Sequence, residues 1–358
     1  MIAADLAITT ASVGLIITLT QIGYAVGLIF IVPLGDILDR RKLILCQTLL
    51  SSAALAGVAV ARTEEWLLIA MVLVGVLAVV VQVLVVFSAS LAAPAARGKA
   101  VGTVTSGIVV GILLARFVAG VLADFGGWRA IYAASAAVTL AMAGLLYRSL
   151  PQDDGARTSI RYVALLRSVA FLYAEMPLLR WRGALGFLVF ATLGTFWTSL
   201  VLPLSAAPYL YSHIEIGLMG LAGAGGALAA SGAGRDRGFA QSTTGVALVL
   251  LVASWGFIAL LHSSLAALVV GVVLLDLAIQ AVHVTNQNMI FAARPDARGR
   301  LVGAYMLFYS TGSAAGAAGS TAIYAQAGWS GVCVLGAAFS STARVVWAAA
   351  QLRQRKGM

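Results

Sequence analysis

The sequence predicts an all-α membrane protein built from two similar bundles of helices. Its 358 residues are 61% hydrophobic and only 10% charged, with a mean hydropathy of +0.99. Long apolar runs recur along the chain, and its second half repeats part of its first half. A soluble protein of this composition would expose large apolar patches. A chain that crosses the membrane many times is therefore the class that fits.

The apolar runs predict about 11 transmembrane helices, because a helix needs about 20 apolar residues to cross a bilayer. They divide into an N-terminal bundle of about five spans over 1–149 and a C-terminal bundle of about six over 184–358, joined by a polar linker over 150–183. The runs lie at 10–34, 43–61, 66–91, 100–122, 129–148, 184–210, 216–233, 242–262, 265–291, 301–323 and 330–350.

Positive charge is concentrated in alternate loops. Of the 23 Lys and Arg residues, 19 lie in one set of loops, and only Arg62 and Arg129 lie in the opposite set. Cytoplasmic loops carry this excess in membrane proteins, so the C-terminus is expected in the cytoplasm and the protein in the cytoplasmic (inner) membrane. The net charge of +10 is then a feature of topology and does not indicate nucleic-acid binding.

An internal repeat relates the two bundles. A shift of 201 positions places Arg97-Gly98 on Arg298-Gly299 and Gly127-Trp128 on Gly328-Trp329, with nine identities in 35 ungapped positions. Parallel repeats of this kind are typical of secondary transporters. Between the bundles, the 150–183 linker has apolar residues at 160, 163, 166 and 169, which predicts a helix lying on the inner membrane surface.

The loop after the first apolar run resembles a signature of the major facilitator superfamily. Over 33–42, residues Gly35, Asp39 and Arg40 match the loop between that family's second and third helices, although its later Gly is absent and the basic pair comes early. The resemblance implies a latch on the cytoplasmic side, and the other interpretation is topology alone. The residues of this cytoplasmic gate motif are Gly35, Asp36, Asp39, Arg40, Arg41 and Lys42.

The resemblance also indicates a branch of the superfamily and a missing helix. Residues 97–102, Gly127-Trp128 and Asn286-Gln287 are similar to the bacterial drug-efflux and arabinose-efflux-like branch. The signature loop follows the first apolar run here, whereas it follows the second helix in the family. The family's first helix is thus expected to be missing. Two interpretations remain open: a start upstream of Met1, or a truncated, non-transporting relative that serves as receptor, scaffold or remnant.

A polar stripe marks the run 265–291. Asp276, Gln280, His283 and Gln287 follow one another at spacings of four, three and four residues, so they share one helical face. A carboxylate this deep in a membrane is costly unless it is paired, protonated or wetted. Asp276 is therefore a candidate proton-coupling site, or else a buried carboxyl satisfied by a neighbouring hydroxyl or Arg. His283 lines the substrate cavity or is structural.

Three further residues are candidates for the substrate cavity. Gln82 is equivalent to His283 under the 201 shift and faces it across the cavity or forms a hydrogen bond within its own half. Arg116 lies within the run 100–122, where it faces the cavity or extends to the membrane surface. Trp197 is part of an aromatic cavity wall or of the apolar core.

The sequence contains no catalytic, phosphate-binding or metal-binding motif, so we predict neither an enzyme nor a cofactor or metal. The predicted function is a secondary active transporter that moves a small organic molecule by alternating access. Proton-coupled efflux (antiport) is expected, and the export direction is implied by the resemblance alone. The predicted partners are the substrate, protons and membrane lipid, and the protein is expected to be a monomer.

Overall fold

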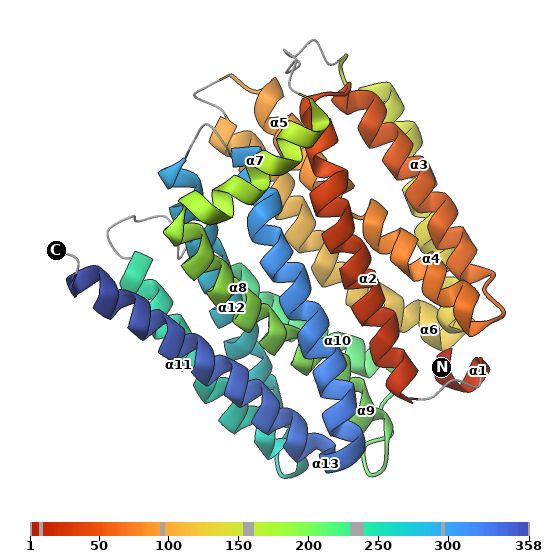
Figure 1. The fold of residues 1–358 in the computed structure, drawn as a ribbon. Helices are drawn as coiled ribbons and strands as arrows, with labels where there is room; N and C mark the ends of the chain where they lie inside the picture. Colours follow the sequence, from red (N-terminus) through yellow and green to blue (C-terminus); the bar gives the residue numbers. More distant parts are fainter. Residues whose placement is uncertain are drawn as a thin grey trace.

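The chain folds into helices that run roughly alongside one another (Figure 1). The computed structural model describes residues 2–6, 10–93, 97–152, 161–229, 240–294 and 298–356. The helices are α1 (Ile2–Asp5), α2 (Thr10–Phe30), η1 (Val32–Asp36), α3 (Arg40–Ala59), α4 (Glu64–Leu77), α5 (Val80–Leu91), α6 (Arg97–Ser149), α7 (Tyr162–Glu175), α8 (Pro177–Ser199), α9 (Val201–Ser205), α10 (His213–Ala229), α11 (Ala240–Ala259), η5 (Leu260–His262), α12 (Leu265–Ala293) and α13 (Arg298–Lys356).

The predicted fold class is confirmed. Eight helical segments of the described chain are long and apolar enough to cross a membrane, and His213–Ala229 is a shorter apolar helix. Two of the eight, in α6 and α13, are interrupted by a turn, and Figure 1 shows α13 changing direction near its label. The total of about eleven spans stays a prediction.

The two turns lie at equivalent places in the halves. Gly127 in α6 has φ +69° and ψ −177°, and Gly328 in α13 has φ +58° and ψ −152°. Only glycine readily adopts these angles, because a side chain would clash with its own backbone. The 201-residue shift relates these two glycines, so the repeat seen in the sequence is also a repeat of backbone geometry.

The halves meet along two helix pairs. The N-terminal half comprises α2 to α6 and the C-terminal half α8 to α13. Helix α2 packs against α13, where Thr18 Oγ1 donates to the Ala314 carbonyl over 3.4 Å. Helix α6 packs against α10, and a Cβ at Gly120 would lie 2.5 Å from the His213 carbonyl oxygen. Glycine permits this close approach of the two backbones.

Helix α8 starts earlier than the apolar pattern predicted. The run was expected at 184–210, but the helix begins at Pro177, a residue favoured in the first helical turn because it needs no amide partner there. The extra turns include Arg182, which the charge pattern assigned to a cytoplasmic loop and which is buried in the structure. Local hydropathy missed this turn because the hydrogen bonds of Arg182 are made with residues far away in the sequence.

Candidate functional site

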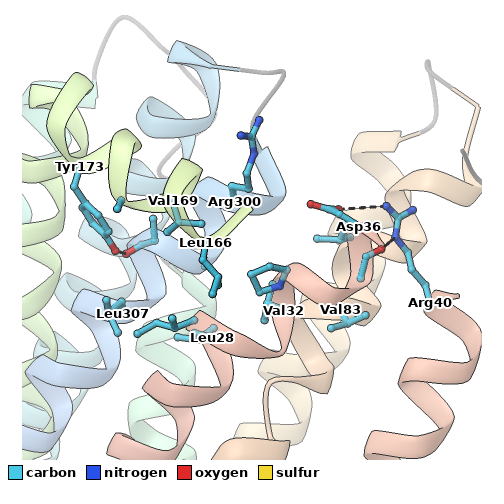
Figure 2. Close-up of a pocket in the computed structure, with 17 residues that line it drawn as sticks. Leu28, Val32, Asp36, Arg40, Val83, Leu166, Val169, Tyr173, Arg300 and Leu307 are labelled. Atoms are coloured by element: carbon cyan, nitrogen blue, oxygen red, sulfur yellow. Dashed lines mark hydrogen bonds and ion pairs between the residues drawn. The ribbon is translucent and has the colours of Figure 1, made fainter. Parts of the chain in front are cut away.

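A cavity of about 210 Å³ lies between the two halves, at the end of the molecule where α7 lies. We call this the α7 end, at the top of Figure 1, and the opposite end, where α13 turns, the glycine-turn end. Figure 2 shows Leu166 of α7, Val32 of η1 and Leu307 of α13 on different sides of the cavity. Its lining is mostly apolar, and its charged residues are Asp36, Arg40 and Arg300.

The gate motif forms one rim of this cavity. Arg40 donates from Nε to the Gly35 carbonyl over 2.7 Å, and its Nη2 lies 3.5 Å from Asp36 Oδ1 (Figure 2). Gly35, Asp36 and Arg40 line the cavity, and Arg300 lines it from the other half. Asp36 and Arg300 carry opposite charges, so their attraction would favour a closed conformation in which they lie closer together.

The other charged residues of the motif act within the N-terminal half. Asp39 is the N-cap of α3 and accepts from the Lys42 amide over 3.1 Å, which satisfies an amide that the helix itself leaves free. Arg41 donates from Nη2 to the Tyr147 carbonyl over 2.8 Å and lies above the Tyr147 ring. Asp36 and Arg40 thus line the cavity, whereas Asp39 and Arg41 form hydrogen bonds within their own half.

Helix α7 connects the halves above the cavity. Tyr162 donates its hydroxyl to the Phe30 carbonyl at the end of α2 over 2.6 Å. Tyr173 donates to the Ala304 carbonyl of α13 over 2.7 Å (Figure 2). Burial raises the pKa of both Tyr hydroxyls, so both remain protonated donors at neutral pH.

The halves are in contact at the glycine-turn end. Asp124 of α6 accepts hydrogen bonds from the amides of His213 and Ile214 over 3.2 and 3.1 Å, and one of its oxygens lies 2.8 Å from His213 Nδ1. A carboxylate at the start of α10 is favourable because the free amides and the helix dipole both attract negative charge. The molecule is thus joined at this end, and its cavity lies at the other.

Asp276 is buried inside the C-terminal half. It is 8% exposed, and its Oδ1 accepts from Trp197 Nε1 of α8 over 3.2 Å. A Cβ added at Gly223 of α10 would lie 2.0 Å from Asp276 Oδ2. The carboxylate is therefore enclosed by α8, α10 and α12 and faces neither lipid nor the cavity at the α7 end. Its role as a proton site stays a prediction.

His283 belongs to a network around a buried tyrosine. Its Nδ1 lies 3.2 Å from the Tyr305 hydroxyl, which also accepts from Asn286 Nδ2 over 3.3 Å. Asn286 Oδ1 in turn accepts from Arg182 Nη1 over 3.1 Å. Gln280 and Gln287, the other stripe members, are half-buried on α12. Asp276 and His283 thus both contact residues of their own half.

Gln82 and His283 lie on the two sides of an aromatic pair. Gln82 Nε2 donates to the Tyr24 hydroxyl over 3.0 Å, within the N-terminal half. The ring centroid of Tyr24 is 6.3 Å from that of Tyr309, and the Tyr309 centroid is 6.3 Å from that of His283. The predicted pair is therefore linked through aromatic rings. The side chain of Arg116 is outside the described part of the structure.

Sequence reasoning missed several residues that the structure places at these sites. Tyr24 contacts Gln82, and Tyr305 and Tyr309 contact His283. Arg182 binds Asn286, and Tyr173 and Arg300 line the cavity. A buried tyrosine in an apolar run resembles any other core aromatic. One local signal could have found Arg182. Proline is common at the first position of a helix, and a helix that starts at Pro177 and continues into the apolar run at 184 includes Arg182.

Comparisons with known proteins agree on one family. A model of the Major Facilitator Superfamily matches residues 1–275. The putative uncharacterized transporter YgaY of Escherichia coli (strain K12) is 43% identical over 348 residues, covering 97% of this chain and 88% of that protein. The probable transporter SCO4007 of Streptomyces coelicolor is 29% identical over 343 residues, covering 95% and 79%.

Solved structures share the fold. The human organic anion transporter MFSD10 (TETRAN) superposes with a TM-score of 0.68 at 20% identity, covering 94% of this chain and 83% of that one. The nucleoside transporter NupG superposes with a TM-score of 0.72 at 14% identity, covering 97% and 92%. Relatives named as transporters favour transport over the alternative of a receptor, scaffold or remnant. The chain belongs to the Major Facilitator Superfamily and is a multi-pass membrane transporter.

Proposed function

We propose that this transporter exports a small amphipathic organic molecule across the cytoplasmic membrane in exchange for protons, as a monomer. The observation that supports this most is the cavity between the halves, which has apolar walls and the charged residues Asp36, Arg40 and Arg300 at its rim. Apolar walls favour the body of an organic substrate. Arg300 offers a cation to an anionic group on it.

Orientation follows from the charge pattern. Loops rich in Lys and Arg mark the α7 end as cytoplasmic, together with the C-terminus. The present conformation then has its cavity toward the cytoplasm, and the Asp124 contacts hold the outer end closed. Rocking of the halves would break those contacts and close the cavity, which brings Arg300 toward Asp36.

Proton coupling is assigned to Asp276. Ionised, it accepts from Trp197 of α8 and lies against Gly223 of α10. Protonation weakens a charge-assisted hydrogen bond and removes a buried charge, so the packing of α10 on α12 changes with it. Helix α10 also begins with the residues that Asp124 binds in the other half. Helix α10 thus connects protonation of Asp276 to the contact between Asp124 and the start of α10 at the outer end.

The test uses the full chain in proteoliposomes with an imposed pH gradient and a panel of labelled organic anions and cations. We expect proton-driven flux of at least one amphipathic anion, and its loss in Asp276→Asn. The control Glu65→Gln removes an exposed carboxylate at the start of α4 and should keep full flux. Equal proton-driven flux in wild type and Asp276→Asn would reject the coupling site.

A second pair of variants tests the cavity itself. Leu307→Trp places a larger side chain in the cavity and should abolish flux of every substrate. Leu352→Trp makes the same change beyond the Gly328 turn of α13, at a residue that is 59% exposed, and should leave flux unchanged. Normal flux in Leu307→Trp would show that substrate takes another route.

A further inference from the structure

A second pocket lies apart from the cavity between the halves. It has a volume of about 220 Å³ and lies between the start of α8, the start of α11 and the last turns of α13. Its polar lining consists of Arg182, Gln241, Gln351 and Arg353, with the indoles of Trp181 and Trp347 beside them. All of these residues belong to the C-terminal half, and none of them lines the first cavity.

Arg182 lies at the base of this pocket and is 4% exposed. Its guanidinium donates to Thr244 Oγ1 over 3.0 Å, to Asn286 Oδ1 over 3.1 Å and to Gln241 Oε1 over 2.7 Å. All three acceptors are neutral, and within the described residues no carboxylate forms an ion pair with Arg182. Three hydrogen bonds fix the orientation of the guanidinium, but they leave its charge uncompensated.

A second cation lies at the mouth of the pocket. The exposed Arg353 lies above the Trp181 ring, 5.4 Å from its centroid. Trp347 Nε1 donates to the same Gln241 oxygen that binds Arg182. Tryptophan is enriched at membrane interfaces, so two indoles beside two arginines indicate a pocket at the level of the lipid headgroups. The remaining wall residues are apolar and include Leu178 and Leu185.

We propose that this pocket binds the phosphate of an anionic phospholipid from the leaflet at the α7 end. Arginine pairs with phosphate through parallel hydrogen bonds, and basic pockets between membrane helices bind phospholipid headgroups. The phosphate lies between Arg182 and Arg353, where it compensates the buried charge. The acyl chains lie along the apolar wall. A free phosphate ester offers the same charge without the chains, and the test separates the two.

The test measures lipid binding to the full chain in detergent by native mass spectrometry, with phosphatidylglycerol as probe and phosphatidylcholine as the zwitterionic control. We expect wild type to retain phosphatidylglycerol in preference to phosphatidylcholine. Arg353→Gln should bind phosphatidylglycerol about tenfold more weakly, and Arg182→Gln more weakly still, because each removes a charge-assisted contact. Arg180→Gln removes an exposed charge only two residues from Arg182 and outside the pocket, and it should bind like wild type.

Two controls keep the result interpretable. Arg353 is exposed, so its variant should fold normally even where Arg182→Gln does not. Glycerol 3-phosphate is added at millimolar concentration as the free phosphate ester. The proposal is supported if other anionic lipids displace phosphatidylglycerol and glycerol 3-phosphate does not. Equal phosphatidylglycerol binding by wild type, Arg353→Gln and Arg180→Gln would overturn it, and so would binding of glycerol 3-phosphate as tight as that of the lipid.

Discussion

The two halves share their backbone plan but differ in how one equivalent helix is packed. In the C-terminal half, Gly312 and Gly316 of α13 lie against α8, and a Cβ at these positions would lie 2.2 Å from the Phe187 carbonyl oxygen and 2.0 Å from that of Ala191. In the N-terminal half, Gly111 of α6 is the counterpart of Gly312, and within the described structure no neighbouring side chain or helix comes within 4 Å of a Cβ there.

The difference lies in the neighbouring helix. Helix α8 provides the surface against which Gly312 and Gly316 pack. Within the described residues, no helix covers Gly111. A stripe of small residues permits close packing where a neighbouring helix lies against it, as α8 does on α13. The repeat determines the turns of both halves, whereas side-chain packing depends on which neighbours each half has.

The largest expected effect contrasts Gly312→Ala with Gly111→Ala. At Gly312 the new methyl group would overlap the α8 backbone, so we expect a loss of about 1–3 kcal/mol in stability. At Gly111 the methyl group meets open space, and the better helix propensity of Ala should stabilise the protein by up to about 1 kcal/mol. Thermal unfolding in detergent measures both. Strong destabilisation by Gly111→Ala would mean that another helix covers this face.

The next effect should be equal in the two halves. Gly127→Ala and Gly328→Ala each force a side chain into backbone angles that glycine alone adopts readily, at a cost of about 1–3 kcal/mol each. Unfolding measurements on the two single variants check this. Gly144→Ala, on the helical part of α6 with open space around it, is the matched control and should not destabilise. A large effect at only one turn would argue against equivalent turns.

A smaller effect distinguishes the residue of the gate motif that stabilises α3 from the residue that faces the cavity. Asp39→Ala removes the N-cap of α3 and should cost about 1 kcal/mol, whereas Asp39→Ser keeps a capping oxygen and should restore stability. Asp36→Asn should leave stability unchanged and slow turnover, because Asp36 faces the cavity. Slow turnover in Asp39→Ser would show that the Asp39 charge also acts in gating. The degenerate counterpart of the motif, at 234–238, is outside the described residues.

The smallest effect concerns α1, which contacts the turn of α6. Asp5 accepts from Arg129 and Trp128, and the Arg129 hydrogen bond holds the pKa of this carboxyl below its usual value. A lowered pKa stabilises the folded form above the unfolded pKa, and this contribution is lost as the pH falls through the folded pKa. Fluorescence of Trp128 should therefore change below about pH 4. Asp5→Asn should abolish this transition, and its persistence would assign it to another group.

Much of the fold could be predicted from the sequence, because its signals are local or repetitive. Apolar length predicts membrane helices, and the 201 register places Gly127 and Gly328 at equivalent turns. The N-cap of α3 could also have been predicted, since Asp39 directly precedes a helix.

The site contacts could not be predicted, because they join residues that are far apart in the sequence. Trp197 and Asp276 are 79 positions apart, and Arg182 binds residues 59, 62 and 104 positions away. Hydropathy assigns a lone charge to a loop and contains no information on distant acceptors. The spacing of the 276–287 stripe predicts a shared helical face. That Asp276 is enclosed by α8 and α10 depends on packing that no local pattern specifies.

The most direct test of the rocking of the two halves is a pair of spin-label distances in one liposome preparation. Labels at Leu38 and Leu352 report on the α7 end and labels at Phe125 and Leu260 on the glycine-turn end, all at exposed positions, with Cys46 replaced by Ala. When substrate and a proton gradient are applied, the first distance should shorten and the second should lengthen. Measurable flux with both distances unchanged would contradict the account.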